Sequence, residues 1–305
     1  MRTETPPTIH LKDYKPSDYL IDHVSLDVGL DPAATGVVSV LKMRPNPASK
    51  TINAPLRLDG EALELKSVAI NGEAIGANRY TVSADQLVID DVPEGPFELT
   101  IETQCNPDAN TALSGLYRSN GVYCTQCEAE GFRRITYFLD RPDVLATYQV
   151  RVEADHDNVP VLLANGNPGE TGELAGGRHF AVWHDPWPKP AYLFALVAGD
   201  LACVTDHFTT MSGRKVELRI YVEQGKQDRC DWAMESLKAS MAWDETAFGR
   251  EYDLDIFMIV AVSDFNMGAM ENKGLNVFND KYILARADTA TDQDYVNIEA
   301  IIAHE

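Results

Sequence analysis

The stretch Val24-Ser-Leu-Asp-Val-Gly-Leu30 alternates apolar and polar residues with a period of two. Successive side chains of a β-strand point to opposite faces of a sheet, so this pattern predicts a half-buried strand. The alternation recurs in residues 97–101 and 148–152, and no long helical pattern interrupts residues 21–200. We therefore expect this part of the chain to form a sandwich or an open sheet of antiparallel strands.

Turn signals separate the predicted strands. Asn71-Gly72 and Asn165-Gly166 each predict a hairpin, because both residues of such a pair accept the positive φ angles of a tight turn. The stretch Asp185-Pro-Trp-Pro-Lys-Pro190 predicts a rigid turn, since proline fixes φ and removes a backbone donor.

The pattern changes after residue 200. Residues 216–222 alternate like a strand, and residues 256–262 form a continuous apolar run typical of a strand buried on both faces. Between them, a helix that ends near Gly249 is predicted by one apolar stripe, made of Cys230, Ala233, Met234, Leu237 and Met241. We expect a mainly β domain over residues 1–200 and an α+β domain over residues 201–305.

A second helix is predicted at the end of the chain. Thr291-x-x-Asp294 resembles a capping box, and the residues after it are heavily apolar. Because the chain ends only about three turns into this helix, we expect the sequence to be truncated within a longer protein.

Composition and charge exclude several classes of protein. With 45% hydrophobic and 24% charged residues, the 305-residue chain has the balance of a soluble globular protein. Its net charge of −21 repels phosphate backbones and anionic lipids, so we expect no nucleic-acid and no membrane partner. Residues 1–10 lack the apolar core of a signal peptide, which favours the cytoplasm. Cys124 and Cys127 have C-x-x-C spacing without a second pair, and we interpret them as packed structural cysteines.

Two short stretches carry the candidate chemistry. His304-Glu305 would begin an H-E-x-x-H zinc motif, whose second histidine would lie at position 308. Gly268-Ala-Met-Glu-Asn272 follows the predicted buried strand, where a loop or an edge strand would carry exposed backbone groups past a cleft. Taken alone, each stretch is more simply a group of surface residues.

Together these stretches resemble the zinc aminopeptidase N family of gluzincin metallopeptidases, in particular its bacterial alanyl type. About 32 residues separate Glu271 from His304, and the similar segments follow the family's order over nearly the whole chain. The other segments that carry the resemblance are residues 264–268, Lys273-Gly-Leu-Asn276, Thr125-Gln-Cys-Glu128-Ala-Glu-Gly131-Phe-Arg-Arg134 and Asp140-Arg-Pro-Asp143.

The resemblance implies a fold and an activity. The fold would be a mainly β N-terminal domain, an antiparallel sandwich or saddle, followed by the α+β beginning of a thermolysin-like catalytic domain. The activity would be zinc-dependent release of N-terminal amino acids, with a broad or alanine-leaning preference, from peptides with a free N-terminus. One Zn²⁺ would bind each complete catalytic domain, and we expect a cytoplasmic monomer that serves peptide catabolism.

The resemblance also implies roles for residues. Glu271 and Glu128, with Gln126 beside them, would hold the α-ammonium of the peptide, since fixed carboxylates form charge-assisted hydrogen bonds with an ammonium. His304 would be a zinc ligand, and Glu305 would be the general base that takes a proton from the zinc-bound water. The remaining zinc ligands would lie beyond residue 305. The other candidate substrate-binding residues are Met267, Gly268, Ala269, Met270 and Asn272.

Several alternatives stay open. Glu128 would otherwise pair with Arg133 or Arg134, and Met267, whose thioether would gate the side-chain pocket, would otherwise be a packed core residue. A related leukotriene-processing epoxide hydrolase uses the same scaffold, although Ala269 matches the plain aminopeptidase pattern rather than that branch's glycine. As a molecule of 305 residues, the chain would otherwise be an inactive β-sandwich binding fragment without a complete metal site.

Overall fold

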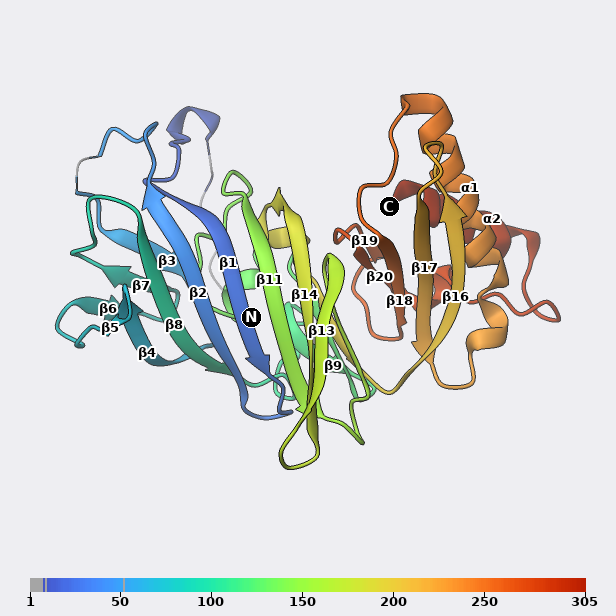
Figure 1. Cartoon of the computed structure of the whole chain (residues 1–305), viewed down its shortest axis with the longest axis horizontal. Coiled ribbons are helices and arrows are strands. Elements are labelled where there is room, and N and C mark those ends of the chain that lie inside the picture. Colours follow the sequence, from blue (N-terminus) through green and yellow to red (C-terminus); the bar gives the residue numbers. More distant parts are fainter. Residues whose placement is uncertain (1–7, 9, 52) are drawn as a thin grey trace.

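The structure is a computed structural model of the chain, and it describes residues 8, 10–51 and 53–305. Strands make up 45% and helices 16% of it, which confirms the prediction of a mainly β fold. Figure 1 shows a broad β-rich part, which runs to Gly199, and a smaller part, from Leu201 onward, in which helices cover a second sheet. Among the described residues, no helix combines the length and the apolar character needed to cross a membrane.

The β-rich part is built around an eight-stranded sheet, in the order β13-β14-β11-β1-β2-β8-β4-β5. Its alternating burial follows the period-two pattern of the sequence, as in β1 and β11. One pairing differs from the expected antiparallel arrangement, because β1 and β11 run parallel. The strands are β1 (Tyr19–Gly29), β2 (Thr35–Pro45), β4 (Glu64–Ile70), β5 (Glu73–Ala74), β8 (Phe97–Cys105), β11 (Ala146–Asp155), β13 (Asn167–Leu174) and β14 (Arg178–Lys189).

Two smaller sheets complete this part and share one apolar core with the large sheet. Phe132 lies in that core, with ring centroids 4.7 Å from Phe138 and 5.1 Å from Phe194 in edge-to-face geometry. One sheet contains β3 (Leu56–Asp59), β7 (Gln86–Ile89) and β6 (Tyr80–Val82); the other contains β12 (Val161–Ala164), β15 (Leu196–Gly199), β10 (Val122–Gln126) and β9 (Gly115–Ser119). As predicted, Cys124 and Cys127 are buried free thiols.

The turn predictions had mixed outcomes. Asn71 and Gly72 have φ angles of 52° and 82° and join β4 to β5, which confirms the first hairpin. The hairpin at Asn165-Gly166 was wrong, because β12 pairs with β15 while β13 belongs to another sheet. The rigid turn at residues 185–190 was also wrong. Residues 186–188 lie in a bulge of β14 opposite β11, where a proline need not donate a ladder hydrogen bond.

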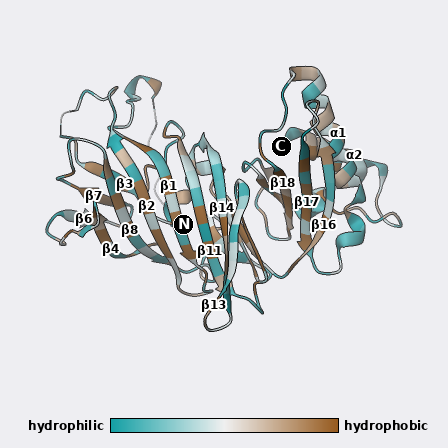
Figure 2. Ribbon diagram, in the orientation of Figure 1, coloured by the Kyte–Doolittle hydropathy of each residue, from teal (hydrophilic) through white to brown (hydrophobic). Residues whose placement is uncertain are grey.

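The second part is a five-stranded sheet, in the order β16-β17-β18-β20-β19. Its strands are β16 (Leu201–Thr209), β17 (Lys215–Glu223), β18 (Ile256–Val262), β19 (Ala269–Met270) and β20 (Leu275–Asn279). Figure 2 shows β18 as an almost continuous hydrophobic strand, as its apolar run predicted. The chain also has short 3-10 helices at Leu11–Asp13, Phe132–Arg134, Ala191–Leu193, Gln227–Arg229 and Asp280–Tyr282.

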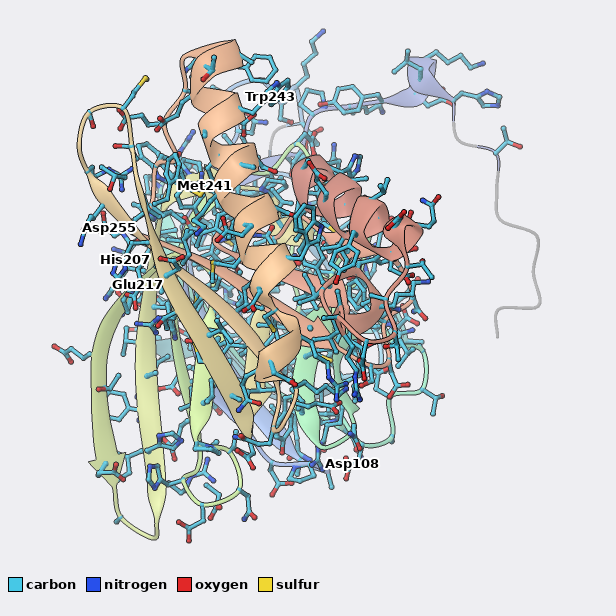
Figure 3. The ribbon with its side chains drawn as sticks, turned by 90° about the vertical axis from the view of Figure 1, so that its right-hand side faces the viewer. Asp108, His207, Glu217, Met241, Trp243 and Asp255 are labelled. Carbon is cyan, nitrogen blue, oxygen red and sulfur yellow. The ribbon has the colours of Figure 1, made fainter. Side chains whose placement is uncertain are left out.

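Two helices cover one face of this sheet, α1 (Asp231–Phe248) and α2 (Asp292–His304). The predicted apolar stripe of α1 is buried, and α1 ends at Gly249, whose φ is 64°. Figure 3 looks onto these helices and shows Trp243 near the exposed end of α1. The predicted capping box of Thr291 and Asp294 opens α2, which buries Ile298 and Ile302.

A buried ion pair joins two residues of β14, Asp185 and Lys189, on either side of its bulge. Lys189 Nζ is 2.9 Å from Asp185 Oδ2, and both side chains are at most 2% exposed. The ammonium also lies 3.5 Å from the centre of the Tyr148 ring. Burial lowers the pKa of Lys189 to about 8, although the carboxylate of Asp185 opposes this shift. Each side chain is buried away from water, so each charge is stabilised mainly by the opposite charge of its partner.

We expect Asp185→Asn to lower the free energy of unfolding by about 3–5 kcal/mol, because it leaves the ammonium buried without a counter-charge. Removing both charges in D185N/K189M should restore much of that loss. The matched control is Asp206→Asn, which breaks an exposed Asp-Lys pair of the same 2.9 Å length and should cost about 1 kcal/mol or less. Urea unfolding measures the free energy of unfolding of D185N, D185N/K189M and D206N. Equal losses of this free energy in D185N and D206N would contradict the buried ion pair.

Candidate active site at the junction of the two parts

The stretch Gly268-Ala-Met-Glu-Asn272 lies at the edge of the five-stranded sheet. Ala269 and Met270 form β19, which pairs with β20 on one side only and is the last strand of the sheet. Figure 1 places β19 on the side that faces the β-rich part. An edge strand presents backbone donors and acceptors on its free side, so an extended peptide could pair with it. Gly268 packs closely against Tyr282 and leaves little room for a side chain, since a Cβ there would lie 3.3 Å from the Tyr282 ring.

The side chains of this stretch divide into two groups. Glu271 and Met267 are exposed, and Met267 has 54% of its surface accessible, so it is not a packed core residue. Met270 and Asn272 are buried, at 1% and 0% exposure. Their side chains are packed inside the protein, so their predicted contact with substrate is expected through the backbone.

Glu128 comes from the β-rich part, just after the end of β10. Its side chain is exposed, and it takes no part in the ion pairs of Arg133 and Arg134. Arg133 pairs with Asp140 at 2.9 Å, and Arg134 pairs with Glu61. The structural alternative for Glu128 is therefore not formed.

Gln126 lies beside Glu128 and is 5% exposed. Its Nε2 donates to the Glu128 carbonyl at 3.3 Å. Its Oε1 is buried and has no hydrogen-bond partner within the described residues. A buried acceptor without a partner is costly and stays available to a ligand donor.

Glu305 follows the last turn of α2. Burial, and then repulsion by Glu271 and Glu128, raises the pKa of its side chain to about 7, while His304 opposes the shift. Its Oε2 is buried without a hydrogen-bond partner in the described part of the chain. Glu271 and Glu128, which are distant from Glu305 in sequence, therefore both lie close enough to repel its carboxylate.

The loop before β19 is tied to the β-rich part by contacts that sequence reasoning missed. Ser119 Oγ donates to Asp264 Oδ2 at 2.9 Å and accepts from the Asp264 N–H at 3.1 Å. Tyr117 Oη donates to the Asp264 carbonyl at 3.0 Å. No local pattern marks Tyr117 or Ser119, because each looks like an ordinary residue of a strand.

A catalytic zinc requires three protein ligands. His304 is exposed at the end of α2. Within residues 8, 10–51 and 53–305, no group of three or more His, Cys, Asp or Glu side chains is arranged to hold a metal ion. These residues alone therefore do not fit a catalytic zinc, and we derive no chemical step through a metal.

Two domain models of one peptidase family match this chain. The model of the Peptidase M1 N-terminal domain matches residues 24–193, and that of the Peptidase family M1 domain matches residues 232–305. The chain is 56% identical to aminopeptidase N of Caulobacter vibrioides and 55% identical to aminopeptidase N of Escherichia coli, over 305 and 303 residues. These alignments cover 100% and 99% of this chain but 35% and 34% of those proteins.

A solved structure agrees with these matches. The crystal structure of Legionella pneumophila aminopeptidase A in complex with aspartic acid has a TM-score of 0.92 and 38% sequence identity to this chain. The match covers 96% of this chain and 34% of that chain. The chain thus spans about a third of the length of the relatives it matches.

The convergence of the three carboxylates is testable by titration. Glu271→Gln removes a nearby negative charge, so the pKa of Glu305 should fall below its present value of about 7. The matched control is Glu130→Gln in the same segment as Glu128, because Glu130 pairs with Arg133 instead. Carbon-detected NMR titration of the Glu305 carboxyl measures both variants. An unchanged pKa in E271Q, or an equal fall in E130Q, would refute the convergence.

Proposed function

The chain belongs to peptidase family M1, and from that premise we propose that it supplies the front part of an aminopeptidase that removes N-terminal residues from peptides. The observation that carries the proposal is the convergence of Glu128, Glu271 and Glu305 beside the edge strand β19. Its fold would correspond to the M1 N-terminal domain, to about residue 200, and the beginning of the catalytic domain after it.

The α-ammonium of the substrate would be bound by Glu128 and Glu271. Both carboxylates are exposed, and neither forms an ion pair with another described residue. An ammonium placed between them would receive charge-assisted hydrogen bonds and would cancel their repulsion. The free Oε1 of Gln126 would accept a further hydrogen bond from it. This arrangement would reject a peptide whose N-terminus is blocked.

The substrate backbone would lie along β19, where the backbone of Gly268 and Ala269 would pair with it as an added strand. Met267, exposed beside this strand, would contact the first side chain of the peptide. Met270 and Asn272 would support the strand from the core.

Glu305 would take the proton from the attacking water and pass it to the leaving amine. A general base works best when its pKa is near the working pH, and the carboxyl of Glu305 has a pKa of about 7. M1 peptidases depend on zinc in general. We propose His304 as one ligand of that metal, whose other ligands would come from residues outside this sequence.

The protein would act on peptides as a monomer in the cytoplasm. The free thiol state of all five cysteines supports a reducing compartment. The excess of 47 Asp and Glu over 26 Lys and Arg supports the absence of nucleic-acid and anionic-membrane partners.

The second candidate is that the 305-residue chain, by itself, is a β-rich binding fragment without activity. The incomplete set of metal ligands among the described residues favours this reading for the isolated chain. Metal analysis separates the two candidates, because the fragment should hold no stoichiometric zinc and the protein of the relatives' full length should hold one zinc per chain.

Hydrolysis of alanyl p-nitroanilide, with and without a zinc chelator, tests the proposal directly. It should be measured on the 305-residue chain and on a protein of the relatives' length that carries this sequence. We expect activity in the longer protein and its loss on chelation. Activity in neither would contradict the aminopeptidase proposal.

In the active protein, Glu271→Gln and Glu128→Gln should each lower kcat/KM for a free-amine substrate by roughly 30-fold or more, because each removes one partner of a desolvated charge pair. Glu130→Gln is the matched control and should leave kcat/KM near the wild-type value. Equal hydrolysis of N-acetylated and free peptides by the wild type would contradict the ammonium site.

A further inference from the structure

Asn165 joins the two parts of the molecule through its side chain. Nδ2 donates to the carbonyl oxygens of Leu193, at 3.0 Å, and Lys273, at 2.8 Å. Oδ1 accepts from the backbone N–H of Ala195 at 2.7 Å. The side chain is 1% exposed, and it uses both donors and one acceptor of its amide on backbone groups.

The segment that Asn165 holds leads directly to Glu128. Leu196 N donates to the Thr125 hydroxyl at 2.9 Å, and Thr125 lies three residues before Glu128. From Leu196 onward the segment becomes β15, which pairs with β10 at Val197 and Ala198. Thr125 is 1% exposed and β10 ends at Gln126, so the segment is bonded to the strand that leads directly into the Glu128 loop.

On its other side, Asn165 holds the segment that carries Glu271. Lys273 follows Glu271 by two residues. Between them, Asn272 is fully buried, and its Nδ2 donates to the Phe194 carbonyl at 3.2 Å. This segment is anchored in turn to the second sheet, where Leu275 N donates to the Asn272 carbonyl at 2.9 Å. A continuous series of buried hydrogen bonds thus runs from beside Glu271 to beside Glu128.

We propose that Asn165 is a positioning residue that fixes the separation of Glu128 and Glu271. It is bonded both to Leu193 and Ala195, whose segment is hydrogen-bonded to the strand before Glu128, and to Lys273, two residues after Glu271. The inference rests on the proposed function of these two carboxylates as the ammonium site. A site for one small cation depends on that separation, because both carboxylates must reach the same ammonium with charge-assisted hydrogen bonds of about 2.7–2.9 Å.

Asn167 provides a matched control. Its Oδ1 accepts from the Asp255 N–H at 2.8 Å, and its Nδ2 donates to Asp255 Oδ2 at 3.2 Å, so it also joins the two parts. These bonds reach the residue before β18 and do not touch the segments of Glu128 or Glu271. Asn167 is only partly buried and its bonds are exposed, so Asn167→Ala removes a side-chain link between the two parts without removing a buried amide. A positioning role for the two carboxylates belongs to Asn165 alone.

The experiment uses the active protein of the relatives' length and compares Asn165→Ala, Asn165→Asp and Asn167→Ala. Asp keeps the acceptor for Ala195 but loses both donors. For alanyl p-nitroanilide we expect both Asn165 variants to raise KM at least about tenfold with kcat changed less than about threefold, since the ammonium contact acts in the ground state and the transition state alike. The inhibition constant of free L-alanine should rise by the same factor, and N167A should match the wild type.

Each other outcome is decisive. A fall in kcat with KM unchanged would indicate a lower folded fraction and would overturn the positioning role, as would an equal rise of KM in N167A. If thermal unfolding shows that no Asn165 variant folds while N167A does, the residue is structural only and the inference is also overturned. Inactivity of the wild type would instead defeat the proposed function, and the inference with it.

Discussion

The repulsion of the Glu305 carboxylate by Glu271 and Glu128 is the interaction on which the candidate site depends. Glu128, Glu271 and Glu305 come from a loop after β10, from the edge of the second sheet and from the end of α2. Burial, and then repulsion by Glu271 and Glu128, raises the pKa of Glu305 to about 7. Holding like charges close together costs electrostatic free energy. The contacts that fix the backbone around these carboxylates therefore determine what this site can bind.

That fixation comes from buried polar side chains rather than from surface ion pairs. Asn165, Asn272 and Thr125 are each at most 1% exposed, and each bonds to backbone groups of residues 193–196 or of the segment after Glu271. These hydrogen bonds restrict the positions of the segments they join, because a buried backbone group without a partner costs free energy. The β-rich part therefore carries Glu128, and these buried hydrogen bonds join it to the part that carries Glu271 and Glu305.

Local signals in the sequence predicted much of this fold. Alternation predicted β1, β8 and β11 of the large sheet, the apolar stripe predicted α1, and Thr291 with Asp294 predicted the start of α2. The pairing of the strands could not be predicted, because alternation is the same in parallel and antiparallel strands. The parallel pairing of β1 with β11 is an example. The Asn-Gly signal failed at residue 165 because tertiary hydrogen bonds, invisible in sequence, recruit that amide. The candidate site residues were found through family resemblance, whereas their convergence depends on the junction, for which the sequence has no local signature.

The central claim is that Glu128 and Glu271 together receive the free ammonium of a peptide. A crystal structure of the active, full-length protein with bound L-alanine tests it most directly. We expect the amino nitrogen to lie within about 2.7–3.1 Å of a carboxylate oxygen of each residue, with the series of bonds through Asn165 intact. An amino group that contacts neither carboxylate, or only one of them, would show that Glu128 and Glu271 do not bind the ammonium together.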